Sequence, residues 1–217
     1  RQMCIRDSDI ITTSVAQQQL RKNEEVIIMP PRVKFSREEI IAAALDIVRR
    51  GGMAALTARS LAAELGSSAK PVFGLFENMQ EVQDEVVRAA NAEYQSFLRA
   101  EMMRGAYPPY KASGMAYIAF ARQEKELFKL LFMRDRTEED SETEDESIDG
   151  IIALISRNTG LSNEDARLFH LEMWIFVHGI ATMIVTGYLD WEEEYVSRTL
   201  TDVYEGLKAR WCGGNGK

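Results

Sequence analysis

Hydrophobic residues recur every three to four positions along most of the chain, and this spacing predicts a protein built from α-helices. One face of the first such segment would carry Ile40, Ile41, Ala44, Leu45 and Val48. Ser36 and Glu39 form a capping-box pattern before it, and Gly51 and Gly52 follow it. We therefore expect a helix that begins after Ser36 and ends at this glycine pair.

The same pattern predicts about nine helices in total. A second helix would begin after Thr57 and run over residues 58–65, and a short third helix would run from Ser67 or Ser68 to about Phe76. The remaining helices are expected at residues 79–103, 110–124, 126–134, 148–159, 163–187 and 191–211. Fourteen glycines and five prolines are few for a β-protein with many turns, so the predicted fold class is all-α.

Residues 57–76 have the spacing of a helix-turn-helix. Its first helix needs a small residue where the second crosses it, and Ala62 is such a residue; Gly66 lies four residues later, where the chain must turn with positive φ. The side chains expected to point inward around the turn are Leu61, Leu65, Val72 and Leu75. The side chains expected to point outward from the third helix, toward base edges and phosphates, are Ser67, Ser68, Lys70 and Phe73.

Residues 35–82 resemble the N-terminal domain of the TetR/AcrR family of transcriptional regulators. The resemblance rests on Leu56-Thr57, on Leu61-Ala62-Ala63-Glu64-Leu65-Gly66-Ser67-Ser68 and on Phe73-Gly74-Leu75-Phe76. It implies that Thr57 and Arg59 contact DNA phosphates and that Ser68 and Lys70 face the major groove. The complete expected DNA-binding set is Arg37, Thr57, Arg59, Ser67, Ser68, Lys70 and Phe73.

The chain departs from that family at two positions. Phe73 stands where a tyrosine hydroxyl usually meets a phosphate, and Met79 stands where a lysine is common. These departures put two phosphate contacts in question. They motivate an alternative function, a ligand-binding or scaffold helical protein that has lost specific DNA binding.

The second half of the chain is similar to one branch of the same family. Residues 117–122 and 126–132 are similar to its central helices, and residues 174–179 to a Trp…His-Gly signature of its C-terminal domain. Glu126 occupies a position where proline is usual. With the N-terminal part, the resemblance covers nearly all of residues 33–210, and it implies a dimer held together by the last two helices.

Aromatic and methionine side chains are abundant in this second half, and most are expected to form a core. Methionine also adapts to irregular ligands, which favours a pocket for a small apolar or amphipathic effector. The residues assigned to that pocket are Met115, Phe120, Phe132, Trp174 and His178. The last two helices are apolar on more than one side, which requires partners on both sides. The residues assigned to a dimer interface are Ile180, Ile184, Tyr195, Val203 and Leu207.

These patterns divide the chain into four parts. Residues 33–78 would form the helix-turn-helix domain and residues 79–211 an effector-binding and dimerisation domain. Residues 1–32 and 212–217 are expected to be disordered tails. The first eight residues resemble translated adapter sequence, so residues 1–28 are interpreted either as non-native, with Met29 as the natural start, or as a native tail. The acidic segment Thr137–Asp149 is expected to be a mobile loop.

The net charge of −8 argues at first against nucleic acid, but the charges are unevenly distributed. Residues 29–78 hold seven basic and five acidic side chains, whereas residues 79–217 hold 15 basic and 25 acidic ones. A mildly basic part attached to an acidic body fits a protein that contacts phosphates with one end only.

Other classes of function find less support. Cys4 and Cys212 fit no metal spacing, which favours a reducing compartment, and the absence of a secretory-signal pattern favours the cytoplasm. His170 and His178 have no carboxylate or cysteine four residues away, so no metal and no cofactor are expected. No nucleophile and base, or paired carboxylates, stand out as catalytic, so the protein is not expected to be an enzyme.

A membrane-associated helical protein is a third alternative, and it rests on Met173–Leu189 alone. This stretch of 17 residues lacks Asp, Glu, Lys and Arg. Roughly 20 apolar residues are needed to cross a bilayer, so a helix buried in protein is favoured. The favoured function is therefore a cytoplasmic homodimeric repressor, released from a palindromic DNA operator by a small-molecule effector.

Overall fold

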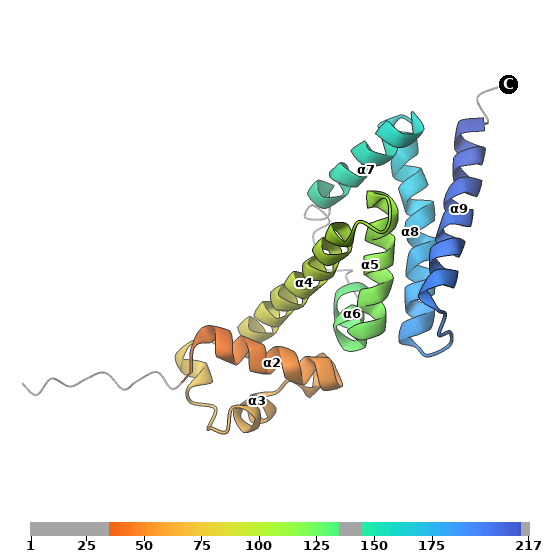
Figure 1. The fold of residues 1–217 in the computed structure, drawn as a ribbon. Helices are drawn as coiled ribbons and strands as arrows, with labels where there is room; N and C mark the ends of the chain where they lie inside the picture. Colours follow the sequence, from red (N-terminus) through yellow and green to blue (C-terminus); the bar gives the residue numbers. More distant parts are fainter. Residues whose placement is uncertain (1–34, 135–144, 214–217) are drawn as a thin grey trace, which may run out of the picture. The chain divides into compact units, whose positions relative to one another are not determined.

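The computed structural model describes residues 35–134 and 145–213, and these residues are helical with no β-strand among them, which confirms the all-α class. Eight α-helices and two 3-10 helices form their regular structure. In chain order these are α2 (Arg37–Gly51), η1 (Met53–Ala55), α3 (Ala58–Glu64), η2 (Val72–Gly74), α4 (Met79–Arg104), α5 (Pro109–Gln123), α6 (Lys125–Phe132), α7 (Asp145–Thr159), α8 (Asn163–Val185) and α9 (Glu193–Gly213) (Figure 1).

The starts of α2 and α3 are set by the side chains that the sequence indicated. The Ser36 hydroxyl accepts a hydrogen bond from the Glu39 amide, and the Glu39 carboxylate accepts one from the Ser36 amide at 2.8 Å. Thr57 makes the same reciprocal pair with Ser60 in place of a glutamate. Each pair satisfies amide donors that have no partner inside the helix, so both helices begin where predicted.

Three predicted boundaries were wrong. The expected third helix is reduced to the 3-10 turn η2 with irregular chain before it. Helix α7 begins at Asp145, inside the segment expected to be a mobile loop, and α9 continues through Cys212 and Gly213, which were assigned to a disordered tail. The predictions for residues 1–32, 135–144 and 214–217 lie outside the described residues.

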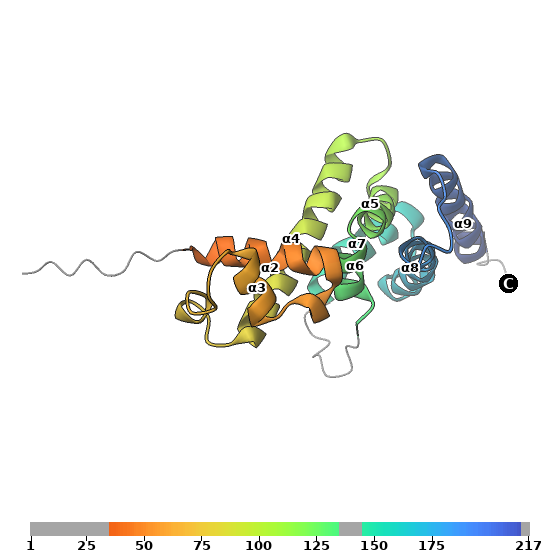
Figure 2. The same ribbon diagram turned by 90° about the horizontal axis from the view of Figure 1, so that it is seen from below.

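The unit formed by residues 35–217 has one main core that runs from α2 into the later helices. It joins side chains of α2, α3 and α4 to those of α5, α6 and α8, and its largest fully buried rings are Phe120 and Phe128. A second cluster around Phe169 packs the ends of α7, α8 and α9 together. Helix α4 leads from α2 and α3 to α5, while α8 and α9 lie on the far side of α5 (Figures 1 and 2). The division expected at residue 78 stays a prediction.

Candidate nucleic-acid interface

The turn after α3 has the geometry that the helix-turn-helix pattern requires. Gly66 has φ +57°, and Ser67 and Gly66 donate backbone hydrogen bonds to the carbonyls of Ala62 and Ala63 at 2.9 and 3.1 Å. This pairing is a Schellman motif, which satisfies the last carbonyls of the helix. A Cβ at Gly66 would meet no atom within 4 Å, so glycine is favoured here by the backbone angle and not by space.

The segment after this turn is irregular for a local reason. Pro71 has no amide hydrogen, and proline disfavours helical geometry at the residue before it. Gly74 adds a residue of low helix propensity. The chain still closes one turn, because Gly74 donates to the Lys70 carbonyl at 3.1 Å and Phe76 donates to the Val72 carbonyl at 3.0 Å.

Burial separates the inward and outward side chains of this region. Leu61 and Val72 are fully buried and Ala62 is 9% exposed, as the motif predicted, whereas Leu65 and Leu75 are half-buried. The predicted DNA-contacting side chains on the solvent side are Thr57, Arg59, Ser68, Lys70 and Phe73, while Ser67 is half-buried. Among the residues that the structure describes, Arg59 and Lys70 form no ion pair with a carboxylate.

Arg37 is the exception to the predicted set, because its guanidinium is already engaged inside the protein. It donates to the Leu75 carbonyl at 2.9 Å and pairs with Glu81 at 2.6 Å and Glu85 at 2.8 Å. It also lies 4.2 Å from the centroid of the Phe76 ring. In this conformation Arg37 therefore anchors the segment after η2 to α4, and its charge is not available to a phosphate. The expectation that Arg37 contacts DNA is corrected accordingly.

This anchor gives the protein a predicted pH dependence. Hydrogen bonds from Arg88 and Arg37 hold the pKa of the Glu85 carboxyl at about 2, below its ordinary 4.5. A carboxyl whose pKa is lower in the folded state stabilises that state above its unfolded pKa, and the contribution is lost as the pH falls. We expect urea titrations between about pH 5 and pH 2 to show a smaller loss of stability in Glu85→Gln than in the wild type. Equal losses would contradict the anchor.

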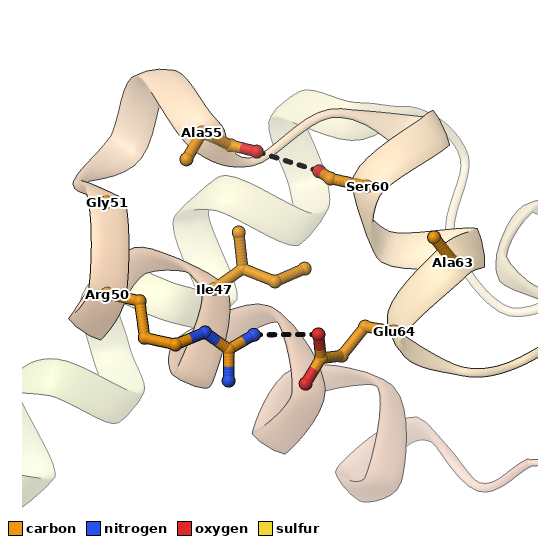
Figure 3. Close-up of a pocket in the computed structure, with 7 residues that line it drawn as sticks. All are labelled: Ile47, Arg50, Gly51, Ala55, Ser60, Ala63 and Glu64. Carbon is orange, nitrogen blue, oxygen red and sulfur yellow. Dashed lines mark hydrogen bonds and ion pairs between the residues drawn. The ribbon is translucent and has the colours of Figure 1, made fainter.

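A surface hollow of about 420 Å³ lies beside the motif, between α2 and α3. Figure 3 shows the Arg50–Glu64 ion pair, 2.7 Å long, at one side of it and the hydrogen bond from Ser60 to the Ala55 carbonyl at the other. Ile47 forms the apolar floor. Because Glu64 neutralises Arg50, this basic side chain is less available to a phosphate than Arg59.

The predicted effector-pocket residues differ in burial: Met115 and Phe120 are buried, Phe132 and His178 are half-buried, and Trp174 is 42% exposed. His178 stacks on Trp174 with centroids 4.9 Å apart and shares a 2.8 Å hydrogen bond with the Tyr117 hydroxyl. Phe132 contacts both Tyr117 and Phe120 in this ring cluster, and Met115 is buried in the main core. Burial lowers the pKa of His178 below its ordinary value.

The predicted dimer residues fall into two groups. Ile180 and Ile184 are each 3% exposed, so they pack inside their own chain and do not form a surface for a partner, which corrects that part of the expectation. Tyr195 is 43% exposed, whereas Val203 and Leu207 are half-buried against the second core cluster.

The exposed apolar face of α8 was not among the predicted sites. Leu168, Leu171 and Ile175 are 47%, 49% and 58% exposed, and their spacing of three and four residues places them on one side of the helix. Helix α8 is also long and apolar enough to cross a membrane, with 39% of its most apolar window buried within the protein. The spacing was visible in the sequence, but it did not reveal which of the two apolar stripes faced the core.

Neither histidine belongs to a candidate metal site in the part of the chain that the structure describes. Within residues 35–134 and 145–213, no three His, Cys, Asp or Glu side chains are placed to hold a metal ion. His170, the other histidine, shares a 3.0 Å hydrogen bond with the Tyr110 hydroxyl and is partly buried. These histidines therefore have protein partners in the structure.

Comparison with known proteins points to one class of protein. Residues 110–204 match the family model of the tetracyclin repressor-like C-terminal domain. An uncharacterised HTH-type transcriptional regulator of Mycobacterium tuberculosis is 27% identical over 169 residues, which cover 72% of this chain and 73% of that protein.

Solved structures share the fold at low sequence identity. A TetR-like transcriptional regulator from Rhodococcus sp. RHA1 matches with a TM-score of 0.58 and 14% identity, covering 83% of this chain and all of that one. A member of the TetR family from Streptomyces coelicolor A3 matches with a TM-score of 0.55 and 21% identity, covering 80% and 98%. At these identities the likeness concerns the fold.

Proposed function

Because residues 110–204 match the tetracyclin repressor-like C-terminal domain, we propose that this chain is a TetR-family transcriptional regulator that acts as a homodimeric repressor in the cytoplasm, released from a palindromic operator by a small apolar or amphipathic effector. Two helix-turn-helix motifs would enter successive major grooves about 34–36 Å apart, or a multiple of that distance. The effector would favour a conformation in which this spacing no longer fits.

The observation that carries the DNA-binding role is the exposed face around Arg59 and Lys70. Both side chains point to solvent and lack a carboxylate partner in the described parts of the chain, unlike Arg37, Arg49 and Arg50. Unpaired basic groups at the start of α3 and just after the Gly66 turn are suited to phosphates and base edges. The remaining predicted contacts, Thr57, Ser67, Ser68 and Phe73, surround them.

The dimer is supported by the apolar face of α8. Leu168, Leu171 and Ile175 expose a continuous apolar stripe, and Tyr195 exposes a further ring on α9. Contiguous apolar surface of this kind usually marks an interface. Helices α8 and α9 lie away from α2 and α3 (Figure 2), so pairing of two copies through them leaves both DNA-binding faces open. Val203 and Leu207 would lie at the edge of that contact.

Coupling between effector and DNA is supported by the contacts of α6. This helix carries Phe128 and Phe132, which contact His178 and Tyr117 in the ring cluster. It begins next to Glu124, whose carboxylate accepts a 2.8 Å hydrogen bond from Arg49 on α2. An effector that separates the rings, among them Met115, Phe120 and Trp174, would displace α6 and through this ion pair the DNA-binding helices. Such coupling is typically worth about 1–3 kcal/mol.

The proposal predicts a salt-dependent interaction with DNA. Duplexes would be selected from a random-sequence library by the wild-type dimer, and their affinity measured by fluorescence anisotropy over a range of salt concentrations. Each phosphate contact contributes about −0.9 to the slope of log K against log[salt]. Arg59→Ala removes one such contact per subunit, so we expect the slope to become shallower by about 1.8. Lys70→Ala is expected to weaken discrimination between selected and random duplexes.

The control for both variants is Arg157→Ala. Arg157 is an exposed arginine on α7, so this change alters the net charge equally without touching the motif. Unchanged binding by both Arg59→Ala and Lys70→Ala would reject the assigned DNA face. If the wild type binds no duplex in a salt-dependent manner, DNA binding is rejected and the ligand-binding or scaffold alternative is favoured.

A further inference from the structure

Phe73 is the only large hydrophobic side chain with an exposed surface among the described residues of the N-terminal part, 35–78. It is 46% exposed, whereas Phe76, one turn later, is 2% exposed and packed in the core. Within the parts of the chain that the structure describes, the Phe73 ring makes no aromatic or cation–π contact. The Phe73 ring is therefore an exposed apolar group that belongs to neither core cluster.

The local backbone holds this ring beside Lys70. Phe73 and Gly74 donate hydrogen bonds to the carbonyls of Ala69 and Lys70, at 3.3 and 3.1 Å, which close one helical turn. Residues three apart on such a turn are neighbours, so the ring and the Lys70 ammonium share the solvent side, opposite the fully buried Val72.

Gly74 leaves room for a close approach at this point. A Cβ built on it would meet no atom within 4 Å, and its φ is not positive, so neither packing nor backbone strain accounts for a glycine here. A glycine without a side chain lets another molecule lie close to the main chain. The ring of Phe73 and the bare backbone of Gly74 together form a small apolar contact surface next to a positive charge.

We infer that Phe73 reads thymine, by packing its ring on the C5-methyl group in the major groove, and this rests on the proposed function. A phenyl ring has no donor for a phosphate or for the polar edges of bases. The thymine methyl is the apolar group that the major groove offers. Lys70, on the same side, can bond a neighbouring guanine or phosphate. Phe73 is therefore a specificity-determining residue that adds little to the electrostatic part of binding.

Uracil substitution tests this contact, because it removes only the methyl group. The probe is the duplex selected by the wild-type dimer, with thymines replaced by uracil symmetrically in both half-sites, one position at a time. Each buried methyl group is worth about 0.8 kcal/mol, so a symmetric replacement, which removes one methyl group in each half-site, should lower the wild-type affinity about 15-fold. Phe73→Ala should bind the thymine and uracil duplexes equally well, and Phe73→Leu should retain part of the preference.

The salt dependence separates this contact from a structural or phosphate role. Phe73→Ala should keep the wild-type slope of log K against log[salt], because no phosphate contact is lost. A shallower slope, or thymine discrimination that survives in Phe73→Ala, would overturn the inference while the proposed DNA binding stands. Failure of the wild type to bind any duplex would reject both. Circular dichroism of Phe73→Ala should match the wild type, since Phe73 is 46% exposed and belongs to neither core cluster.

Discussion

Replacing Ile175 with aspartate is expected to convert the protein from a dimer into a monomer and to weaken operator binding at least a hundredfold. Ile175 is 58% exposed and is the most exposed member of the apolar stripe on α8, so the substitution does not disturb the core of the single chain. In the proposed dimer it would bury one carboxylate from each subunit in the interface, without a partner. A monomer contacts one half-site only. It therefore loses the gain in affinity that comes from linking two DNA-binding motifs, typically a factor of 10²–10⁴.

Sedimentation velocity and fluorescence anisotropy on the selected duplex measure the two effects. The matched control is Met103→Asp, which introduces the same charge at a side chain that is 86% exposed near the end of α4. This control should remain a dimer and bind DNA normally. A dimeric Ile175→Asp protein would show that the α8 stripe is not the interface, and equal loss in both variants would indicate a general effect of charge.

Replacing Phe120 with alanine is expected to lower the free energy of unfolding by about 3–5 kcal/mol. The Phe120 side chain is fully buried and contacts the rings of Tyr94, Phe97 and Phe132 at centroid distances of 5.4, 5.3 and 6.4 Å. Its removal leaves a cavity where α4, α5 and α6 meet, and close-packed neighbours refill such a space only in part.

Urea unfolding at a fixed protein concentration measures this loss, because the stability of a dimer depends on concentration. The control is Phe73→Ala, the same chemical change at an exposed ring, which should alter stability by less than about 0.5 kcal/mol. A loss below about 1 kcal/mol in Phe120→Ala would mean that the ring cluster collapses into the space. That result would contradict the close packing of the cluster.

Local signals predicted much of the N-terminal part. Ser36 and Thr57 cap their helices as expected, because a cap depends on residues within three positions of one another. Gly66 turns the chain with positive φ for the same local reason. The third helix was overestimated, because Pro71 and Gly74 disrupt helical hydrogen bonding around Val72.

Contacts between residues far apart in the sequence could not be predicted from these local patterns. Arg37 was included in the expected DNA-binding set, yet its partners Glu81 and Glu85 lie more than forty residues later. The pairing of Arg49 with Glu124, 75 residues apart, went unpredicted as well. Both arginines form ion pairs that link α2 to later parts of the chain, and no pattern along one helix indicates them.

Residue order along the chain determined the helical class, most helix starts and the position of the Gly66 turn. Caps, apolar spacing and a glycine turn all act between residues that are close in sequence. Tertiary structure decided which apolar stripe of α8 is buried and which arginines are already paired. Ile184 and Ile175 are equally hydrophobic, and only the packing of α8 against α5 puts the first in the core and leaves the second on the surface. Hydrophobicity is a property of the side chain, whereas burial depends on what the fold places opposite it.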